Sequence, residues 1–311
     1  MIDHFGGRIP EPSEKTMSLQ YIGRYNTVDG SIKSTRFVDP KGRFTLVSTR
    51  SDYTRHGITL TKTECLKTFK NGRSKKYAHF TVSGSIHKYS NKGKHNYDQF
   101  TIKKYRFALR DIERHFGIDA NNTILTSLEA GVNLHLRVPA ARIIESIKCY
   151  KQKPYSKMFF ADSRAEQLIY HLTQQKFKVY DKGLQFQERF GTNENLLRIE
   201  LAMIKSQQFS TLEIKTLADL EAEDKWQKLG NKLITCSNQL VIFENKGDKK
   251  GMNLKSKELI ALLNDRQNWL NVDKHTFKRH KKHLNKYSHI NHLKDEILGL
   301  MQIEIEEMIS K

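Results

Sequence analysis

The stretch Thr126–Leu136, TSLEAGVNLHL, decides the fold because apolar and polar residues alternate along it. Successive side chains of a β-strand point to opposite faces of the sheet. One face of this strand is apolar and the other is polar or small: Leu128, Ala130, Val132, Leu134 and Leu136 against Glu129, Gly131, Asn133 and His135. The pattern predicts a strand of an antiparallel sheet that packs one face on a hydrophobic core.

Two later stretches alternate in the same way. In the strand predicted at 196–205, LLRIELAMIK, the charged positions on the polar face are Arg198 and Glu200. In the strand predicted at 176–182, KFKVYDK, the polar positions are Lys176, Lys178, Tyr180 and Lys182. We expect the polar faces of all three strands to line one side of a common sheet.

The residues around these strands predict the rest of the fold. Residues 1–100 read as strands and turns, and apolar residues at helical spacing predict a helix over 98–116. Pro139 opens a helix predicted at 139–150, and the chain becomes mostly helical after about residue 212. We therefore predict an α+β fold with an antiparallel sheet core and flanking helices in domain 1–245, followed by a basic helical C-terminal region, 246–311.

The composition indicates a polyanionic partner. Among 311 residues, 54 Lys plus Arg stand against 34 Asp plus Glu, which gives a formal net charge of +20. Nucleic acid is the leading candidate, because neutralised phosphates release their counterions, and a generally basic proteome is the alternative explanation. A membrane surface ranks lower, because no stretch approaches the roughly 18 apolar residues of a spanning helix. We predict no membrane association and no secretory signal.

The cysteines indicate a reducing compartment. Cys65, Cys149 and Cys236 are odd in number and far apart, and no CxxC pair occurs. This arrangement predicts neither a disulfide framework nor a cysteine zinc site. We expect all three to be packing residues.

The polar faces carry the groups that phosphodiester cleavage needs. Glu129 and Glu200 offer hard oxygen ligands for Mg²⁺ or Mn²⁺, and Tyr180 could attack phosphorus and form a covalent phosphotyrosine. Lys178 and Lys182 would stabilise the phenolate and hold the phosphate. The alternative is a solvated sheet face, which is the commoner meaning of one charged strand face. Gly131 and Ala202 argue mildly for the site, because small residues leave room beside a sheet.

At these strands the sequence resembles a known family, the filamentous-phage gene II replication endonucleases and the related phage and plasmid gene II/X proteins. The resemblance covers roughly residues 1–245. It runs through the opening Met1-Ile2-Asp3, SGSIHKYSNKGKHNYDQF (83–100), ILTSLEAGVNLHL (124–136), VYDKGLQF (179–186) and LLRIELAMIKSQQF (196–209). Its most specific motifs are Tyr180-Asp181-Lys182 and Arg198-Ile199-Glu200, with Lys205 following.

The resemblance implies a rolling-circle initiator that nicks and rejoins one DNA strand. It implies that Tyr180 is the nucleophile and that Glu129 and Glu200 help to hold the metal. Lys178, Lys182 and Arg198, on the same polar faces, are the further candidate catalytic residues. It also places the basic segment 88–96 near DNA, with Lys88, Lys92, Lys94 and His95. Many such nickases have two histidines separated by one hydrophobic residue, whereas Leu134-His135-Leu136 offers only His135 as a further ligand. Three other tyrosines remain rivals of the nucleophile: Tyr150, Tyr155 and Tyr170.

Two C-terminal segments carry separate predictions. Basic residues crowd a short helical stretch that includes Lys278, Arg279, Lys281 and Lys282. This stretch suits binding of the phosphate backbone, and a solvated helical face is the alternative. The final helix has apolar residues at helical spacing, which indicates core or a partner seam. These residues are Ile297, Leu298, Met301, Ile305 and Met308.

We therefore expect an enzyme of the bacterial cytoplasm that starts rolling-circle replication. Its partner would be a replication origin, as single-stranded or supercoiled DNA, with host polymerase and helicase as further candidates. A DNA-binding protein of a phage or plasmid without chemistry, such as a repressor or strand-binding protein, is the first alternative. An RNA-binding or RNA-processing protein is the second, and it predicts stronger binding to structured RNA than to DNA of matched length.

Overall fold

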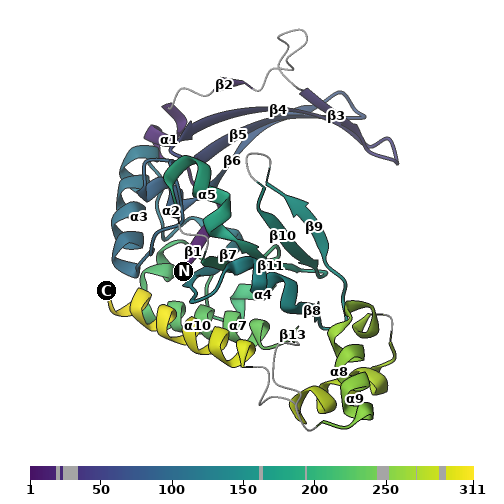
Figure 1. Ribbon diagram of the computed structural model, residues 1–311. Coiled ribbons are helices and arrows are strands. Elements are labelled where there is room, and N and C mark those ends of the chain that lie inside the picture. Colours follow the sequence, from purple (N-terminus) through teal and green to yellow (C-terminus); the bar gives the residue numbers. More distant parts are fainter. Residues whose placement is uncertain are drawn as a thin grey trace.

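The computed structural model describes residues 1–18, 22–23, 34–160, 164–192, 195–243, 252–270, 272–286 and 292–311. Among these residues, eleven strands form one antiparallel sheet in the order β2-β4-β5-β6-β1-β7-β12-β11-β10-β9, with β3 paired to β4 (Figure 1). The strands are β1 (Ile2–Ile9), β2 (Ile22–Gly23), β3 (Ser34–Val38), β4 (Phe44–Arg55), β5 (Ile58–Phe69), β6 (Ser74–Ser85), β7 (Ile124–His135), β9 (Ser156–Phe159), β10 (Glu166–His171), β11 (Gln175–Asp181) and β12 (Leu196–Met203). The predicted α+β class with an antiparallel sheet is confirmed.

The three strands found by alternation are adjacent in this sheet. Strand β12 pairs with β7 on one side and with β11 on the other. Glu200 lies opposite both Gly131 and Lys178, and Arg198 lies opposite Asn133 and Tyr180. Because directly paired residues point to the same face, the polar faces form one continuous surface, as predicted.

The apolar face of the sheet is covered by helices. Helix α3 (Ile102–Phe116) begins after Thr101, whose side chain accepts a hydrogen bond from the Lys104 backbone, and ends at Gly117 in the left-handed conformation. Helices α7 (Glu223–Ser237) and α10 (Leu293–Ser310) pack together beneath the sheet. The apolar positions of α10 are buried in the main core, so the final helix is a core element.

The other described helices before residue 245 are short. They are α1 (Glu14–Ser18), α2 (Ile86–Ser90), α4 (Ala140–Ser146), α5 (Lys182–Phe190), α6 (Gln207–Ser210) and the 3-10 helix η1 (Ala218–Glu221). No described helix combines the length and the apolar character needed to cross a bilayer. The three cysteines are buried and free, as expected of packing residues.

Several predicted element boundaries are wrong. The helix predicted over 98–116 begins only at Ile102, and the strand predicted at 196–205 ends at Met203. The helix predicted at 139–150 ends at Ser146, and β8 (Ile147–Tyr150) follows and pairs with β13 (Leu240–Ile242). That partner strand lies about 90 residues later in the chain, so local periodicity did not reveal it. The strand predicted at 176–182 ends at Asp181, because its carboxylate accepts a 2.7 Å hydrogen bond from the Leu184 backbone and caps α5. Lys182 is therefore the first residue of a helix.

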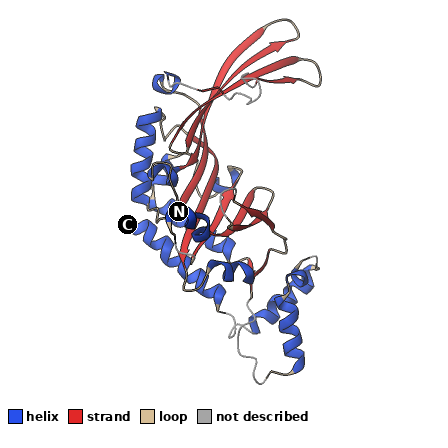
Figure 2. Ribbon diagram, turned by 45° about the horizontal axis from the view of Figure 1, so that its top comes forward, coloured by secondary structure: helices blue, strands red, loops and turns tan. Residues whose placement is uncertain are grey.

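The region after residue 245 contributes two different structures. Helices α8 (Leu254–Asn264), η2 (Arg266–Trp269) and α9 (Lys274–Lys286) form a small unit (Figure 2). It packs around Trp269 in a second hydrophobic core, which it shares with Cys149 of β8 and with Val241 and Phe243. This unit rests on β8, where Lys148 donates a 2.9 Å hydrogen bond to Asn264. Helix α10 instead belongs to the main core. The boundary predicted at 245/246 lies outside the described residues.

Candidate active site on the polar face of the sheet

Three carboxylates from three neighbouring strands converge at the centre of the polar face. They are Asp3 of β1, Glu129 of β7 and Glu200 of β12, and one oxygen from each lies within 4.8 Å of the others. Asp3 and Glu200 are buried, and Glu129 is partly buried. Oxygen ligands of this kind suit Mg²⁺ or Mn²⁺. The acidic cluster, defined as these three residues, therefore has the donor chemistry of a divalent metal site.

Asp3 is the member that strand alternation did not reveal. Strand β1 pairs with β7, and the register shifts between Ile2, opposite Ala130, and His4, opposite Glu129. The extra residue at this shift is Asp3, and such a bulge re-aims a side chain within a strand. The only sequence signal for Asp3 was its place in the Met1-Ile2-Asp3 opening that the chain shares with the resembled family. That resemblance assigned no role to Asp3.

The Tyr180 phenol contacts the acidic cluster. Its hydroxyl donates a 2.9 Å hydrogen bond to Glu200. The ring is 3 % exposed and is partly covered by Phe160, whose ring centroid lies 5.0 Å away. Tyr180 is therefore buried among charged groups and not in the apolar core. Little of Tyr180 is open to solvent, so a molecule approaching its hydroxyl would have to displace the side chains that cover it.

Lysine and arginine side chains compensate the carboxylates. Lys178 donates to Glu129 at 2.5 Å and to Glu200 at 3.1 Å. Arg198 donates to Asp3 at 2.9 Å and also contacts Glu200 through Nε. Both cations lie on the strands where the sequence predicted them, and each contacts two carboxylates of the acidic cluster.

Lys182 reaches the phenol from the first turn of α5. Its Nζ lies 3.4 Å from the Tyr180 hydroxyl and donates a 2.8 Å hydrogen bond to Asn96 Oδ1. Asn96 Nδ2 in turn donates to Asp3 at 2.8 Å. Asn96 thus connects the lysine to the acidic cluster. The sequence placed Asn96 only near DNA and did not identify this link.

The environment shifts the pKa values of these groups in opposite directions. Burial, followed by the charge of Glu200, raises the pKa of Glu129 to about 8 despite the attraction of Lys178. Burial and the charge of Arg198 lower the pKa of Lys182 to about 7. Burial and Glu200 raise the pKa of Tyr180 well above its ordinary value. A bound cation would favour the charged form of Glu129, and with three convergent carboxylate oxygens the residues present fit a divalent metal.

Gly131 makes room for the charged side chains. A Cβ on this residue would lie 2.7 Å from Glu200 Cγ and 3.1 Å from Arg198 Nη2. The space beside Gly131 is therefore filled by the cluster itself. We predict that Gly131→Ala destabilises the protein by about 1 to 3 kcal/mol, because the added carbon overpacks the site. Chemical denaturation measures this change.

Gly299 provides the matched control for that substitution. It lies on α10, and a Cβ added there would meet no atom of the described residues within 4 Å. Gly299→Ala should leave stability unchanged or raise it, because alanine favours helix more than glycine does. Equal stability of the wild type and Gly131→Ala would contradict the crowded geometry.

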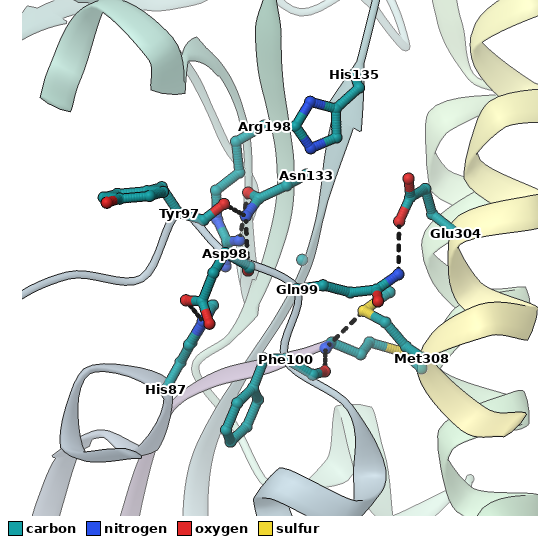
Figure 3. A pocket seen from close by; sticks show the side chains of 12 residues that line it. His87, Tyr97, Asp98, Gln99, Phe100, Asn133, His135, Arg198, Glu304 and Met308 are labelled. Carbon is teal, nitrogen blue, oxygen red and sulfur yellow. Dashed lines mark hydrogen bonds and ion pairs between the residues drawn. The ribbon is translucent and has the colours of Figure 1, made fainter. Parts of the chain in front are cut away.

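His135 lies outside the acidic cluster. It is exposed at the end of β7 and lines a pocket with Asn133, Arg198 and Glu304 of α10 (Figure 3). Glu129 is six residues away on the same strand, which spans about 20 Å at the rise of a β-strand. That separation keeps His135 from sharing a metal ion with Glu129.

The three rival tyrosines lie away from the cluster. Tyr170 pairs with Phe177, so it occupies the face opposite to Tyr180. Tyr150 stacks on Phe177 with ring centroids 4.8 Å apart, which places it in the same core. The Tyr155 hydroxyl contacts Arg266. Among the four tyrosines considered from the sequence, only Tyr180 contacts a carboxylate of the cluster.

The predicted DNA-binding residues occupy two separate surfaces. Lys88 lies in the last turn of α2, is half-buried and is close to Lys182. Lys92 and Lys94 are exposed in the loop between α2 and α3, where His95 stacks on Tyr97. The second surface is on α9. There Lys278, Arg279 and Lys282 are exposed, while Lys281 is half-buried with its Nζ 6.0 Å from the Phe277 ring centroid.

The chain is similar to a solved structure but matches no family model or curated sequence. Among solved structures, the chain is similar to a rolling circle replication initiator protein from Geobacillus stearothermophilus, with 8% identity and a TM-score of 0.35. That similarity covers 91% of this chain and 95% of the other. The function proposed below rests on the residues of this chain.

Proposed function

We propose that this protein is a metal-dependent DNA nickase that starts rolling-circle replication of a phage or plasmid. The observation that carries the proposal is the convergence of the Tyr180 phenol, three carboxylates and two lysines on one face of the sheet. A phosphodiester-cleaving site needs a nucleophile, a group to take its proton and positive charge near the phosphate. The acidic cluster, together with Tyr180, Lys178 and Lys182 beside it, provides all of these groups.

The roles follow from the contacts. Tyr180 would attack phosphorus through its phenolic oxygen while the bond between phosphorus and the 3′ oxygen breaks, which leaves the 5′ phosphate on Tyr180. The departing 3′ oxygen would become the 3′ hydroxyl by taking the proton that the phenol gave up. The phenol proton would pass to Lys182, whose amine stands 3.4 Å from the hydroxyl and whose lowered pKa makes its neutral form available near neutral pH. Glu200 accepts the hydrogen bond of the phenol and orients it, but its own pKa of about 2 makes it a poor proton acceptor. Asp3, Glu129 and Glu200 would hold Mg²⁺ or Mn²⁺, which supplies charge stabilisation at the phosphate when bound.

The direct test is a nicking assay on DNA. Single-stranded circles and supercoiled plasmids carrying the replicon's origin would be incubated with the protein and Mn²⁺ or Mg²⁺. We expect an adduct that joins the protein to the 5′ phosphate at the nick, a free 3′ hydroxyl on the other end, and complete loss of both with EDTA. Absence of nicking on the origin, with DNA binding retained, would sink the proposal and leave a DNA-binding protein whose cluster is a structural ion network.

Helix α9 gives a separate prediction about DNA affinity. Replacing the exposed Arg279 or Lys282 by glutamate should weaken duplex binding, because each removes a cation available to a phosphate. The slope of log affinity against log salt should fall by about 1 for each lost phosphate contact. Fluorescence anisotropy over a salt series measures both quantities.

Two variants serve as controls for α9. Lys281→Ala should have the smaller effect, since Lys281 is half-buried beside Phe277. Lys255→Glu changes an exposed charge on α8 of the same unit. If Lys255→Glu reduced affinity and salt dependence as much as Arg279→Glu, the α9 face would not be the contact.

A further inference from the structure

A patch of aromatic rings adjoins the candidate active site, and no catalytic role uses it. The aromatic patch consists of His95, Tyr97, Phe186 and Phe190. The rings of His95 and Tyr97 stack at a centroid distance of 4.2 Å. Tyr97 lies 5.4 Å from Phe186 and 5.6 Å from Phe190, and His95 lies 5.4 Å from Phe190. The patch joins the loop after α2 to the helix α5.

The patch reaches the surface rather than completing the core. Phe190, at the last turn of α5, is 38 % exposed, and His95 and Tyr97 are partly exposed. Neither these three rings nor Phe186 belongs to the main hydrophobic core. Exposed aromatic rings on a soluble domain commonly mark a binding surface.

Exposed lysines precede the patch along the chain, and the carboxylate of Asp98 lies 3.5 Å from the His95 ring on its other side in the sequence. Lys92 and Lys94 are exposed in the same loop, directly before His95. Lys88 stands one turn earlier, at the end of α2. Aromatic rings on which bases stack, combined with lysines that follow a phosphate backbone, are the surface chemistry of single-strand binding.

Lys182 connects the patch to the phenol. Its Nζ lies 4.8 Å from the Phe186 ring centroid and 5.3 Å from the Tyr180 ring centroid. The amine also stands 3.4 Å from the Tyr180 hydroxyl. A strand whose phosphate lies at Tyr180 therefore has neighbouring nucleotides within reach of the aromatic rings.

We propose that the aromatic patch is a stacking platform for unpaired bases of single-stranded DNA beside the cleaved phosphate. The proposal rests on the proposed function for the choice of DNA, and it adds where and how the strand is held. Stacking accepts any base, because every base has an aromatic face. The platform thus supplies affinity for an unpaired strand, and it disfavours duplex DNA, whose bases already stack on one another.

The experiment measures binding without cleavage. The full chain carrying Tyr180→Phe would be titrated, without metal, into a fluorescent dT oligomer and into an abasic oligomer of equal length. We expect the dT oligomer to bind more tightly than the abasic one. Phe190→Ala should lower the dT affinity on the order of 10-fold and leave the abasic affinity nearly unchanged. Phe190→Trp should restore the preference, because it restores a ring.

Matched controls separate stacking from charge and from damage to the fold. Phe107 on α3 is 76 % exposed and lies outside the patch, so Phe107→Ala should keep the preference for dT. Lys94→Ala should lower the affinity for the dT oligomer and for the abasic oligomer by the same factor. Equal binding of the dT and abasic oligomers by the parent protein would overturn the proposed stacking platform. An unchanged preference for dT in Phe190→Ala would do the same. Either result would leave the nicking proposal standing if the protein still nicks DNA. Tighter binding of a matched rU oligomer than of dT would overturn the assignment to DNA.

Discussion

Tyr180→Phe is expected to abolish the covalent protein–DNA adduct, with a loss on the order of 10³-fold or more, while the protein stays folded. The substitution removes only the hydroxyl, which donates to Glu200, and leaves the ring packed against Phe160. DNA affinity should change little, because the lysines near the cluster remain. Labelled DNA on a denaturing gel measures the adduct, and circular dichroism checks the fold.

Tyr170→Phe is the control for this result. Tyr170 is fully buried on the opposite face of the sheet, and its hydroxyl has no hydrogen-bond partner in the described residues. Its removal should therefore leave adduct formation intact. Normal adduct formation by Tyr180→Phe would remove Tyr180 from the mechanism. Loss of the adduct in Tyr170→Phe as well would mean that the assay reports packing rather than chemistry.

Glu200→Gln is expected to abolish nicking and also to lower the free energy of unfolding by about 3 kcal/mol, the scale of breaking a buried ion pair. Glu200 accepts hydrogen bonds from Tyr180, Lys178 and Arg198 in a buried setting. An uncharged amide leaves the two cations with less compensation than before. Urea denaturation at neutral pH measures the loss.

The effect of Glu200→Gln on stability should depend on pH in a defined direction. Burial alone raises the pKa of Glu200, but the charges of Arg198 and Lys178 outweigh burial and lower it to about 2. A carboxylate whose pKa folding lowers stabilises the protein above its unfolded value near 4.5, and this contribution disappears as the pH falls toward 2. The difference between wild type and Glu200→Gln should therefore shrink below about pH 4.5.

Glu64→Gln provides the surface comparison. Glu64 on β5 pairs with Lys62 at 2.9 Å, and its side chain is 59% exposed. Exposed pairs contribute about 0 to 1 kcal/mol, so this variant should be close to the wild type. If Glu200→Gln were as stable as Glu64→Gln at neutral pH, the buried ion network would not support the fold as described.

Strand alternation was sufficient to predict most of the candidate site. The residues Glu129, Tyr180, Arg198 and Glu200 share a face because a period of two fixes which side chains point together within each strand. Adjacent pairing of β7, β12 and β11 then brought them into contact. Which strands pair was not predicted, because alternation alone does not identify neighbours. The sequence supported only the expectation that the three polar faces line one side of a common sheet.

Other parts of the site could not be predicted from local pattern. Asp3 faces the cluster only because the β1–β7 register shifts at that residue, and pairing register is a tertiary property. Lys182 reaches Tyr180 from a helix, since Asp181 caps α5, and not from the strand that alternation suggested. His135 follows the alternation of β7 but stands too far along the strand to join the acids.

The position of β1 between β6 and β7 has a consequence for how the molecule is assembled during translation. Asp3 leaves the ribosome first, but the strands that carry its two acidic partners follow only with residues 129 and 200. Contacts between such distant segments require the closure of long loops, and topologies of this kind reach the native state slowly. A nascent polypeptide that has not yet extended past β12 lacks Glu200, so the three carboxylates of the acidic cluster cannot assemble until that strand has been made.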